Sequence, residues 1–511
     1  MTQPSLFDAG PPPPCPARFN MAAHTLGHDR AAPAKVALEV LAAPGLVAES
    51  WSYGALRAAV LAAAGGLAAR GIGRGDRVLL RLGNTSDFPI LFFAANALGA
   101  VPVPTSTQLT EPEVAGIIAD LDPALILAGP GVACPPAPNR IGADGIAALR
   151  AHPPLADFAA TAPDDPAYMI YTSGTGGRPK GVVHAQRAAW ARRMMWDGWY
   201  GLTSEDRVLH AGAFNWTYTL GAGLTDPWAI GATALIYAGP PDRGVWPALA
   251  AAHRATLFAA TPGVYRQMLG SGADLAAGFA HLRHGLSAGE AMPAAVAAEF
   301  AARTGRAVYE ALGMSEVSTY ISFAPQSPPV PGRAGRPQPG RRVAILPDDP
   351  GGGPVPRGEP GRLAVSRRDP GLMLGYWRRP EETEASFEGE WFLTGDRAAL
   401  HDDDTLTYLG RADDLLNAGG FRVSPAEVEA ALLAHPGVAE AAVVERAVRD
   451  GVTIIAAFYV PAGEPPAEED LARHCSARLA RYKCPRSFTP LDALPRSANG
   501  KIQRRALKEG L

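Results

Sequence analysis

The sequence predicts an α/β fold in a chain of more than one domain. The chain has 511 residues, which is too long for one ordinary hydrophobic core. From Tyr53 to Leu127, runs typical of helices alternate with short apolar runs typical of strands. This alternation predicts a parallel sheet covered by helices on both faces.

The expected elements follow in chain order. The first half of the pattern predicts helices at 53–70, 87–98 and 111–119, and strands at 78–80, 101–103 and 124–127. After a glycine-rich loop the pattern resumes, with a helix at 186–195, a strand at 208–210, a helix-like run from Thr217, and buried strands at 232–237 and 256–260.

The pattern of residue types changes after about residue 325. Proline and glycine recur there between short alternating runs such as 362–366, and this predicts a small β-rich subdomain up to about residue 412. We therefore expect a flexible leader over 1–17, a large N-terminal domain over 18–412, and a small, mobile α+β domain over 413–511.

The terminal segment has its own signals. Ser424–Glu427 is a capping-box start with Pro425 at the first helical position, which predicts a helix that ends near His435. Strands at 438–445 and 452–460 are expected to form a hairpin through Asp450 and Gly451, followed by a helix at 468–481.

Composition excludes several classes of protein. The net charge is only −3 and the basic residues are spread along the chain, which argues against a nucleic-acid partner. The 4 cysteines show no CxxC pair, so we expect neither zinc nor disulfides and place the protein in the reducing cytoplasm. The longest apolar helical run, 88–100, is shorter than the ~20 residues that cross a bilayer.

The stretch Tyr171–Gly181 (YTSGTGGRPKG) carries the strongest chemical signal. Its glycines let backbone N–H groups approach an anion, its hydroxyls can donate to phosphate oxygens, and Arg178 and Lys180 supply positive charge. No Gly-Lys-Ser/Thr closes it, so it is not a Walker A loop. The residues alone leave a flexible polar turn as an equal alternative.

This loop resembles the phosphate-binding signature of the adenylate-forming superfamily of acyl-CoA synthetases, luciferases and peptide-synthetase adenylation domains. The resemblance covers essentially the whole chain after the leader. Further motifs follow in the family's order at 287–293, 310–316, 391–396, 419–422 and 495–502.

The resemblance implies ATP, Mg²⁺ and coenzyme A as partners in a two-step ligase reaction. It assigns Lys501, Glu316 and Ser315 to catalysis: Lys501 bridges the carboxylate and the α-phosphate, Ser315 touches the α-phosphate, and Glu316 holds Mg²⁺. It also assigns ATP contacts to Thr172, Ser173, Gly174, Thr175, Gly176, Lys180, Gly289, Glu290, Asp396 and Arg411. Leu312 departs from the family pattern, which often has an adenine-stacking Tyr there.

The same match assigns a hinge and a thiol tunnel to the C-terminal part. Asp413 corresponds to the residue about which the small domain rotates between the two half-reactions. Gly419, Gly420 and Arg422 correspond to the segment that lines the path of the CoA thiol.

The run Phe214–Gly221 resembles the benzoate-CoA-ligase branch most closely. In that branch the equivalents of Trp216 and Tyr218 border the acyl pocket, together with those of Gly289 and Thr319. Two large rings would shorten the pocket, which favours an aromatic or short-to-medium acid. Thr319 stands where the branch often has a His. Core packing is an equal alternative for both rings.

The sequence is also compatible with two other functions. A free-standing adenylation enzyme would load a carrier protein in place of CoA, and a scaffold would bind nucleotide without catalysis. The tail resembles the sequence that bacterial lysine acetyltransferases modify, which makes Lys501 a candidate target, and a homodimer is a further partner hypothesis.

Overall fold

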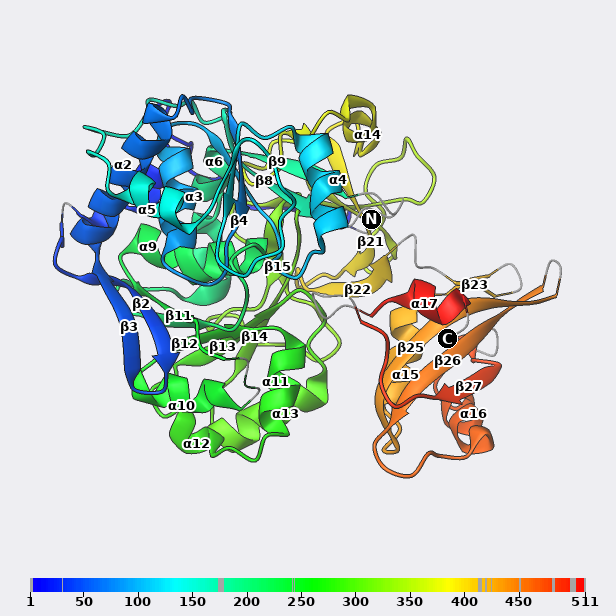
Figure 1. Ribbon diagram of the computed structural model, residues 1–511. Coiled ribbons are helices and arrows are strands. Elements are labelled where there is room, and N and C mark those ends of the chain that lie inside the picture. The colour runs from blue at the N-terminus through cyan, green and yellow to red at the C-terminus, as the bar shows by residue number, and fades with distance from the viewer. Residues whose placement is uncertain are drawn as a thin grey trace. The chain divides into compact units, whose positions relative to one another are not determined.

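The computed structural model describes residues 3–29, 31–172, 179–240, 242, 244–411, 416–418, 421–423, 425–449, 452–479, 483–496 and 502–509. The chain divides into two compact units. Unit 1 comprises residues 1–6, 344–364 and 393–511, and unit 2 comprises residues 7–343 and 365–392. The expected α/β class is confirmed by the sheets and helices below (Figure 1).

Unit 2 is built on a long sheet of order β16-β15-β14-β13-β12-β10-β11-β2-β3. Its interior pairs, from β14 to β2, are parallel, and its edge pairs are antiparallel. The strands are β2 (Val36–Ala43), β3 (Leu46–Ser52), β10 (Arg207–His210), β11 (Thr233–Tyr237), β12 (Leu257–Ala260), β13 (His284–Ala288), β14 (Val308–Met314), β15 (Ser318–Ser322) and β16 (Arg336–Pro337).

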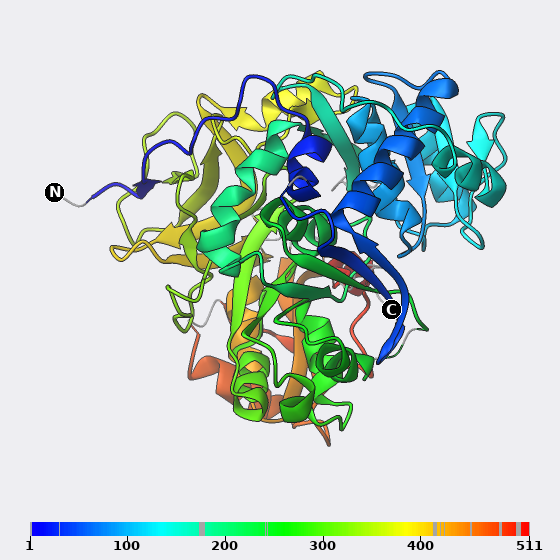
Figure 2. The same cartoon turned by 90° about the vertical axis from the view of Figure 1, so that its left-hand side faces the viewer.

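Helices cover both faces of this sheet, as the alternation predicts. One face packs on α2, α3 and α9, and the other on α10 to α13, which lie beneath the sheet as green helices in both views (Figures 1 and 2). The helices are α2 (Tyr53–Ala69), α3 (Asp87–Ala97), α9 (Asp226–Ile230), α10 (Val245–Ala252), α11 (Pro262–Leu269), α12 (Leu275–Gly278) and α13 (Ala294–Thr304). The Ser52 side chain caps α2 by accepting from the Ala55 N–H, which satisfies one free helix donor.

Two smaller sheets complete unit 2. The order β5-β4-β6-β7 is parallel, and β19-β9-β8 is antiparallel. The strands are β4 (Arg77–Arg81), β5 (Val101–Pro104), β6 (Leu125–Ala128), β7 (Arg140–Ile141), β8 (Pro166–Thr172), β9 (Lys180–Ala185) and β19 (Gly375–Tyr376). Strand β20 (Phe387–Glu388) belongs to neither of these two sheets. The remaining helical segments are α1 (Met21–Thr25), η1 (Gly27–Asp29), α4 (Glu111–Leu121), α5 (Ala143–Arg150), α6 (Arg187–Ala191), α7 (Arg193–Met195), η2 (Trp196–Tyr200), α8 (Thr217–Leu220), η3 (Gly221–Thr225) and α14 (Pro380–Ala385).

Unit 1 contains the strand order β17-β18-β21, with β22 antiparallel to β21, and a second sheet of order β25-β26-β27. The strands are β17 (Arg342–Leu346), β18 (Gly361–Ser366), β21 (Trp391–Leu400), β22 (Leu406–Arg411), β23 (Leu416–Ala418), β24 (Phe421–Val423), β25 (Val438–Arg449), β26 (Val452–Pro461) and β27 (Ser487–Pro490). The helices are α15 (Pro425–Leu433), α16 (Glu468–Ser476) and α17 (Arg504–Glu509). The expected hairpin of β25 and β26 is antiparallel, whereas Ser424, Asp450 and Gly451 lie outside the described residues.

Three expectations differ from the structure. Within the expected leader, Leu6–Asp8 form strand β1, and Ser5 is buried with its N–H bonded to the Val355 carbonyl at 2.7 Å. The expected helix 186–195 is two helices, α6 and α7, that meet at Arg192. The expected helix 468–481 ends at Ser476. The composition of the leader gave no sign of this strand, because the backbone hydrogen bonds of Ser5 go to Val355 and Ile345, which are distant in the sequence.

The two units also divide the chain differently from the expected boundary at 412/413. Residues 344–364 and 393–411, placed in the large domain by the sequence, cluster with the C-terminal part. Within the described residues, no helix is both long enough and apolar enough to cross a membrane.

Candidate active site

Strands β8 and β9 hold the two ends of the glycine-rich loop. Thr172, the last residue of β8, pairs with Lys180, the first residue of β9, and Tyr171 pairs with Gly181. The loop is therefore the connection of an antiparallel hairpin. Ser173, Gly174, Thr175 and Gly176 lie outside the described residues.

Lys180 is the first member of a polar cluster at this hairpin. Its Nζ pairs with the Glu382 carboxylate and lies 5.2 Å from the centre of the Tyr376 ring. The hydrogen bond from Lys180 lowers the pKa of Glu382. The Tyr376 hydroxyl donates to Oε1 of Glu316 at 3.0 Å. Tyr376 thus connects Lys180 with Glu316, two residues that are far apart in the sequence.

The turn between β14 and β15 carries Ser315 and Glu316, and Thr319 follows in β15. Nε2 of His184 bonds the Ser315 carbonyl at 2.8 Å, Nη2 of Arg341 donates to the Thr319 carbonyl at 2.9 Å, and the Met373 N–H donates to the Glu316 carbonyl at 2.8 Å. Burial lowers the pKa of His184 to about 4, so its ring is neutral at pH 7. Two side chains and one backbone N–H, from separate parts of the sequence, thereby hold the turn and the start of β15.

A buried ion pair stands behind the same turn. Nε of Arg192 donates to Oδ1 of Asp226 at 2.8 Å, Nη2 donates to Oδ2 at 2.6 Å, and the Tyr200 hydroxyl donates to Oδ2 at 2.8 Å. The side chains of Arg192 and Asp226 are 8% and 1% exposed. The third arm of Arg192, Nη1, donates to Oγ of Ser318. Two-pronged pairing of this kind fixes the guanidinium plane.

Glu310, on β14, is another carboxyl whose pKa is shifted. Burial raises its pKa to about 7, against the opposing hydrogen bond from the Met292 N–H, which donates to Oε1 at 3.0 Å. Glu310 pairs in register with Ser287 on β13. Its carboxyl therefore titrates near neutral pH beside the segment that carries Gly289 and Glu290.

The four residues expected around the acyl group fall into two places. Gly289 has φ +99°, and a Cβ there would lie 2.6 Å from Cη2 of Trp216. Trp216 and Tyr218 form an edge-to-face pair with ring centres 5.3 Å apart, and the Tyr218 hydroxyl donates to the Leu286 carbonyl at 3.2 Å. These three residues form one wall, named the acyl wall below. Thr319 is instead buried against Met195.

Asp396 and Arg411 meet in unit 1. They pair in register on β21 and β22, with Nη1 of Arg411 3.6 Å from Oδ1 of Asp396. The Tyr408 hydroxyl donates to the same oxygen at 3.2 Å, and Nη1 of Arg411 donates to the Thr394 carbonyl at 2.9 Å. Carboxylate oxygens are hydrogen-bond acceptors, so a carboxylate fixed in this way suits the binding of ligand hydroxyls.

The C-terminal site residues are described only in part. Lys501, Asp413, Gly419 and Gly420 lie outside the described residues, and of Arg422 only the backbone, in β24, is described. Their assigned roles stay predictions.

The donor set for a divalent cation is small. Over the described ranges, no three His, Cys, Asp or Glu side chains converge as a ready-made metal cluster. Mg²⁺ is commonly held by one or two carboxylates together with substrate phosphates. A single fixed carboxylate such as Glu316 fits that manner of binding.

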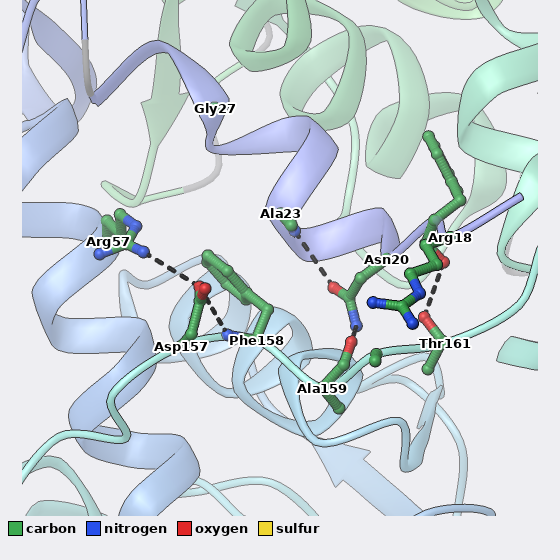
Figure 3. Close-up of a pocket in the computed structure, with 11 residues that line it drawn as sticks. Arg18, Asn20, Ala23, Gly27, Arg57, Asp157, Phe158, Ala159 and Thr161 are labelled. Carbon is green, nitrogen blue, oxygen red and sulfur yellow. Dashed lines mark hydrogen bonds and ion pairs between the residues drawn. The ribbon is translucent and has the colours of Figure 1, made fainter. Parts of the chain in front are cut away.

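A cavity of about 330 Å³ lies elsewhere in unit 2, between α1, α2 and the segment 157–161 (Figure 3). Its polar groups mostly bond each other: Asn20 donates to the Ala159 carbonyl at 3.3 Å, Thr161 donates to the Phe19 carbonyl at 2.6 Å, and Arg57 lies 3.4 Å from Asp157. None of the motif residues lines it. We interpret it as a packing crevice beside α1.

Sequence reasoning missed the residues that support the site. Tyr376, His184 and Arg341 bond Glu316, Ser315 and Thr319. Arg192 bonds Ser318 and is held by Asp226. Each of the five is isolated in the sequence. Tyr376 follows Glu316 by 60 residues, and no periodicity connects the two. A single sequence holds no signal that would have identified them.

Family models match most of the chain. The model described as "AMP-binding enzyme" matches residues 28–377, and the model described as "AMP-binding enzyme C-terminal domain" matches residues 427–501. All the motifs of unit 2 that were singled out in the sequence fall within the first match.

Named relatives point to acid–CoA ligases. The chain is 32% identical to a "3-hydroxybenzoate--CoA ligase" of Aromatoleum sp. (strain CIB), over 90% of this chain and 92% of that protein. It is 34% identical to a "Benzoate--CoA ligase" of Thauera aromatica, over 85% of each chain. Among solved structures, a benzoate CoA ligase from Burkholderia xenovorans LB400 is similar with a TM-score of 0.84 and 30% identity, over 96% of this chain and 100% of that one.

Proposed function

Because this chain belongs to the AMP-binding enzyme family and is an AMP-forming acid–CoA ligase, we propose that its substrate is an aromatic acid. It uses ATP and coenzyme A, as the family does. The enzyme class rests on the relatives, and the choice of acid and the roles of single residues are our proposal.

The observation that carries the proposed nucleotide-binding roles is the link between Lys180, Tyr376 and Glu316. A cation at the rim of the phosphate loop and a carboxylate suited to Mg²⁺ share one tyrosine, through a ring contact of 5.2 Å and a hydrogen bond of 3.0 Å. This arrangement suits a site that must offset the charge of a polyphosphate while it presents a metal ligand. Asp396 and Arg411 would bind the ribose.

The first half-reaction needs positioning and charge compensation rather than a covalent enzyme intermediate. The substrate carboxylate attacks the α-phosphate of ATP, pyrophosphate leaves, and an acyl-adenylate remains. Lys180 and the loop hold the β- and γ-phosphates, Ser315 contacts the α-phosphate, and Lys501 stabilises the charge that builds there. Bound Mg²⁺, held by Glu316, would neutralise phosphate charge. The CoA thiol then displaces AMP.

The acyl wall supports an aromatic acid. Trp216 and Tyr218 present two large rings at right angles, and Gly289 leaves room only up to the Trp216 indole. A flat ring can pack between such surfaces, whereas a long chain would need a path through them. Leu312 can replace the usual stacking ring with apolar contact.

ATP–pyrophosphate exchange with a panel of acids tests the proposal. We expect exchange with benzoates and hydroxybenzoates, weaker exchange with long-chain fatty acids, and thioester formation with CoA in preference to a holo-carrier protein. Lys501→Ala should abolish exchange. Absence of exchange with every acid would favour a nucleotide-binding scaffold.

The second half-reaction would require rotation of the C-terminal domain about Asp413, which brings Gly419, Gly420 and Arg422 to the CoA path. Asp413→Pro should then leave exchange largely intact and slow thioester formation. Equal losses in both half-reactions would contradict this role.

We also propose a cytoplasmic location and regulation at Lys501. None of the four cysteines, Cys15, Cys134, Cys475 and Cys484, all within the described residues, forms a disulfide, which suits a reducing compartment. Acetylation would remove the Lys501 charge, and mass spectrometry after incubation with a lysine acetyltransferase tests it. A homodimer is a further prediction, and light scattering would test it by measuring the molar mass in solution.

A further inference from the structure

Two buried polar side chains beside the acyl wall lack hydrogen-bond partners in the described part of the chain. His210, the last residue of β10, is 5% exposed, and neither of its ring nitrogens is bonded. Thr219, in α8, is 0% exposed, and its hydroxyl is unbonded. Buried polar groups are nearly always paired, so each such group requires an explanation.

The two side chains approach one point from different elements. A Cβ on Gly212 would lie 2.3 Å from Oγ1 of Thr219 and 3.1 Å from Nδ1 of His210. Only glycine at position 212 leaves room for this approach. The unpaired oxygen and nitrogen therefore both face the position that a Gly212 side chain would occupy.

This point lies at the deep end of the acyl wall. The His210 ring packs edge-on against Tyr218 with centres 4.5 Å apart, and Tyr218 in turn packs edge-on against Trp216. Exposure falls along this series: Gly289 is exposed, Trp216 is half-buried, and Tyr218, His210 and Thr219 are buried. An acid whose carboxylate lies near Gly289 would direct the far side of its ring toward His210 and Thr219.

Two comparable side chains nearby are paired, whereas the Ser287 hydroxyl on β13 is buried and unbonded. Thr225, in the segment that follows α8, donates its hydroxyl to the Leu220 carbonyl at 2.9 Å. His284 bonds the Tyr200 carbonyl through Nε2 at 2.7 Å. Burial lowers the pKa of His210 to about 3, so its imidazole is neutral and offers one donor and one acceptor. A small group that both donates and accepts would satisfy His210 and Thr219 together.

We propose that His210 and Thr219 bind a hydroxyl or amino substituent on the ring of the acid, so that the preferred substrate is a polar-substituted aromatic acid. The proposal rests on the proposed function. A substrate hydroxyl would donate to the unprotonated imidazole nitrogen and accept from the Thr219 hydroxyl. A site of this kind rejects the analogue that lacks the hydroxyl, because its polar groups are then left unpaired.

The test compares kcat/KM for benzoate with that for its hydroxy and amino derivatives in the exchange assay. The wild-type protein should prefer at least one derivative by about tenfold or more. His210→Phe and Thr219→Val should each reduce that preference about tenfold, and His210→Gln, which keeps a donor and an acceptor, should retain part of it. Thr225→Val is the matched control. It should change kcat/KM for benzoate and kcat/KM for the derivative by the same factor, so the preference should stay as in the wild type.

Thermal unfolding of the ligand-free protein gives an independent readout. Thr219→Val replaces an unpaired buried hydroxyl and should raise Tm, whereas Thr225→Val removes a bonded hydroxyl and should lower it. A preference for benzoate in the wild type, or an unchanged preference in both variants, would overturn the inference, and a water molecule would then be the better occupant. Failure of exchange with every acid would instead overturn the proposed function.

Discussion

Nη1 of Arg192 donates a hydrogen bond of 2.6 Å to Oγ of Ser318. Ser318 has φ +75°, a left-handed conformation that costs free energy for a residue with a side chain. It is the first residue of β15 and directly follows the turn that carries Ser315 and Glu316. We interpret Arg192 as a positioning residue that holds the turn in this conformation.

The first prediction concerns Arg192→Met. This change leaves Asp226 buried without its guanidinium, which should cost about 3 to 5 kcal/mol of unfolding free energy, and it releases Ser318. Chemical denaturation measures the first effect and ATP–pyrophosphate exchange the second.

The double variant Arg192→Met/Asp226→Leu separates the two effects. Removing both charges should restore much of the stability, while exchange activity stays low because Ser318 has lost its donor. Recovery of full activity in the double variant would show that Arg192 acts only on stability.

A second prediction concerns the Tyr376 hydroxyl. Tyr376→Phe keeps the ring beside Lys180 but removes the hydrogen bond to Glu316. Loss of such a partner of a metal ligand typically weakens metal binding about 10- to 100-fold. The Mg²⁺ concentration for half-maximal exchange should rise accordingly. Tyr376→Leu also removes the ring, so it should impair activity further, and an unchanged Mg²⁺ dependence in Tyr376→Phe would argue against Glu316 as the ligand.

A third prediction concerns Gly289→Ala. The new Cβ would lie 2.6 Å from the Trp216 ring and require φ +99°, so kcat/KM for the acid should fall about tenfold or more. Adding Trp216→Ala removes the clash but not the backbone strain, and should recover only part of the loss. A wild-type kcat/KM in Gly289→Ala would contradict the close contact between position 289 and Trp216.

The sequence predicted the parts of the fold that depend on local pattern. Helix α2 and strands β10 and β11 match the expected ranges within one or two residues, because apolar periodicity and caps are local properties. β1 was missed because its order depends on backbone partners near Val355, hundreds of residues away.

The candidate site shows the same division. Motif residues such as Glu316 and Asp396 were found by resemblance, whereas Tyr376 and Arg192 act through contacts that only the fold creates. The acyl wall lies between these cases: Trp216 was named from the sequence, but its contact with Gly289 depends on the end of β13.

A fourth prediction concerns Asp396. If its carboxylate binds the ribose hydroxyls, Asp396→Asn should reduce the preference for ATP over 2′-deoxy-ATP about tenfold or more, since hydrogen bonds to a charged group are the stronger ones. Asp404→Asn, which removes a carboxylate paired with Arg357 at 2.8 Å, is the control and should leave the ratio unchanged. The ratio of kcat/KM values in the exchange assay decides the question.

The last prediction concerns pH and Glu310. Burial raises its pKa from 4.5 to about 7 in the folded chain. Between these values the folded state keeps a proton that the unfolded state has released, so the free energy of unfolding falls as pH rises. Below pH 4.5 both states hold the proton, and above about pH 7 the loss is complete.

Glu310→Gln should flatten this slope, because glutamine does not titrate. Denaturant midpoints measured from pH 4.5 to pH 8 would show it. Glu384→Gln, at a side chain that is 76% exposed, is the matched control and should leave the slope as in the wild type. A slope that persists in Glu310→Gln would place the titrating group elsewhere.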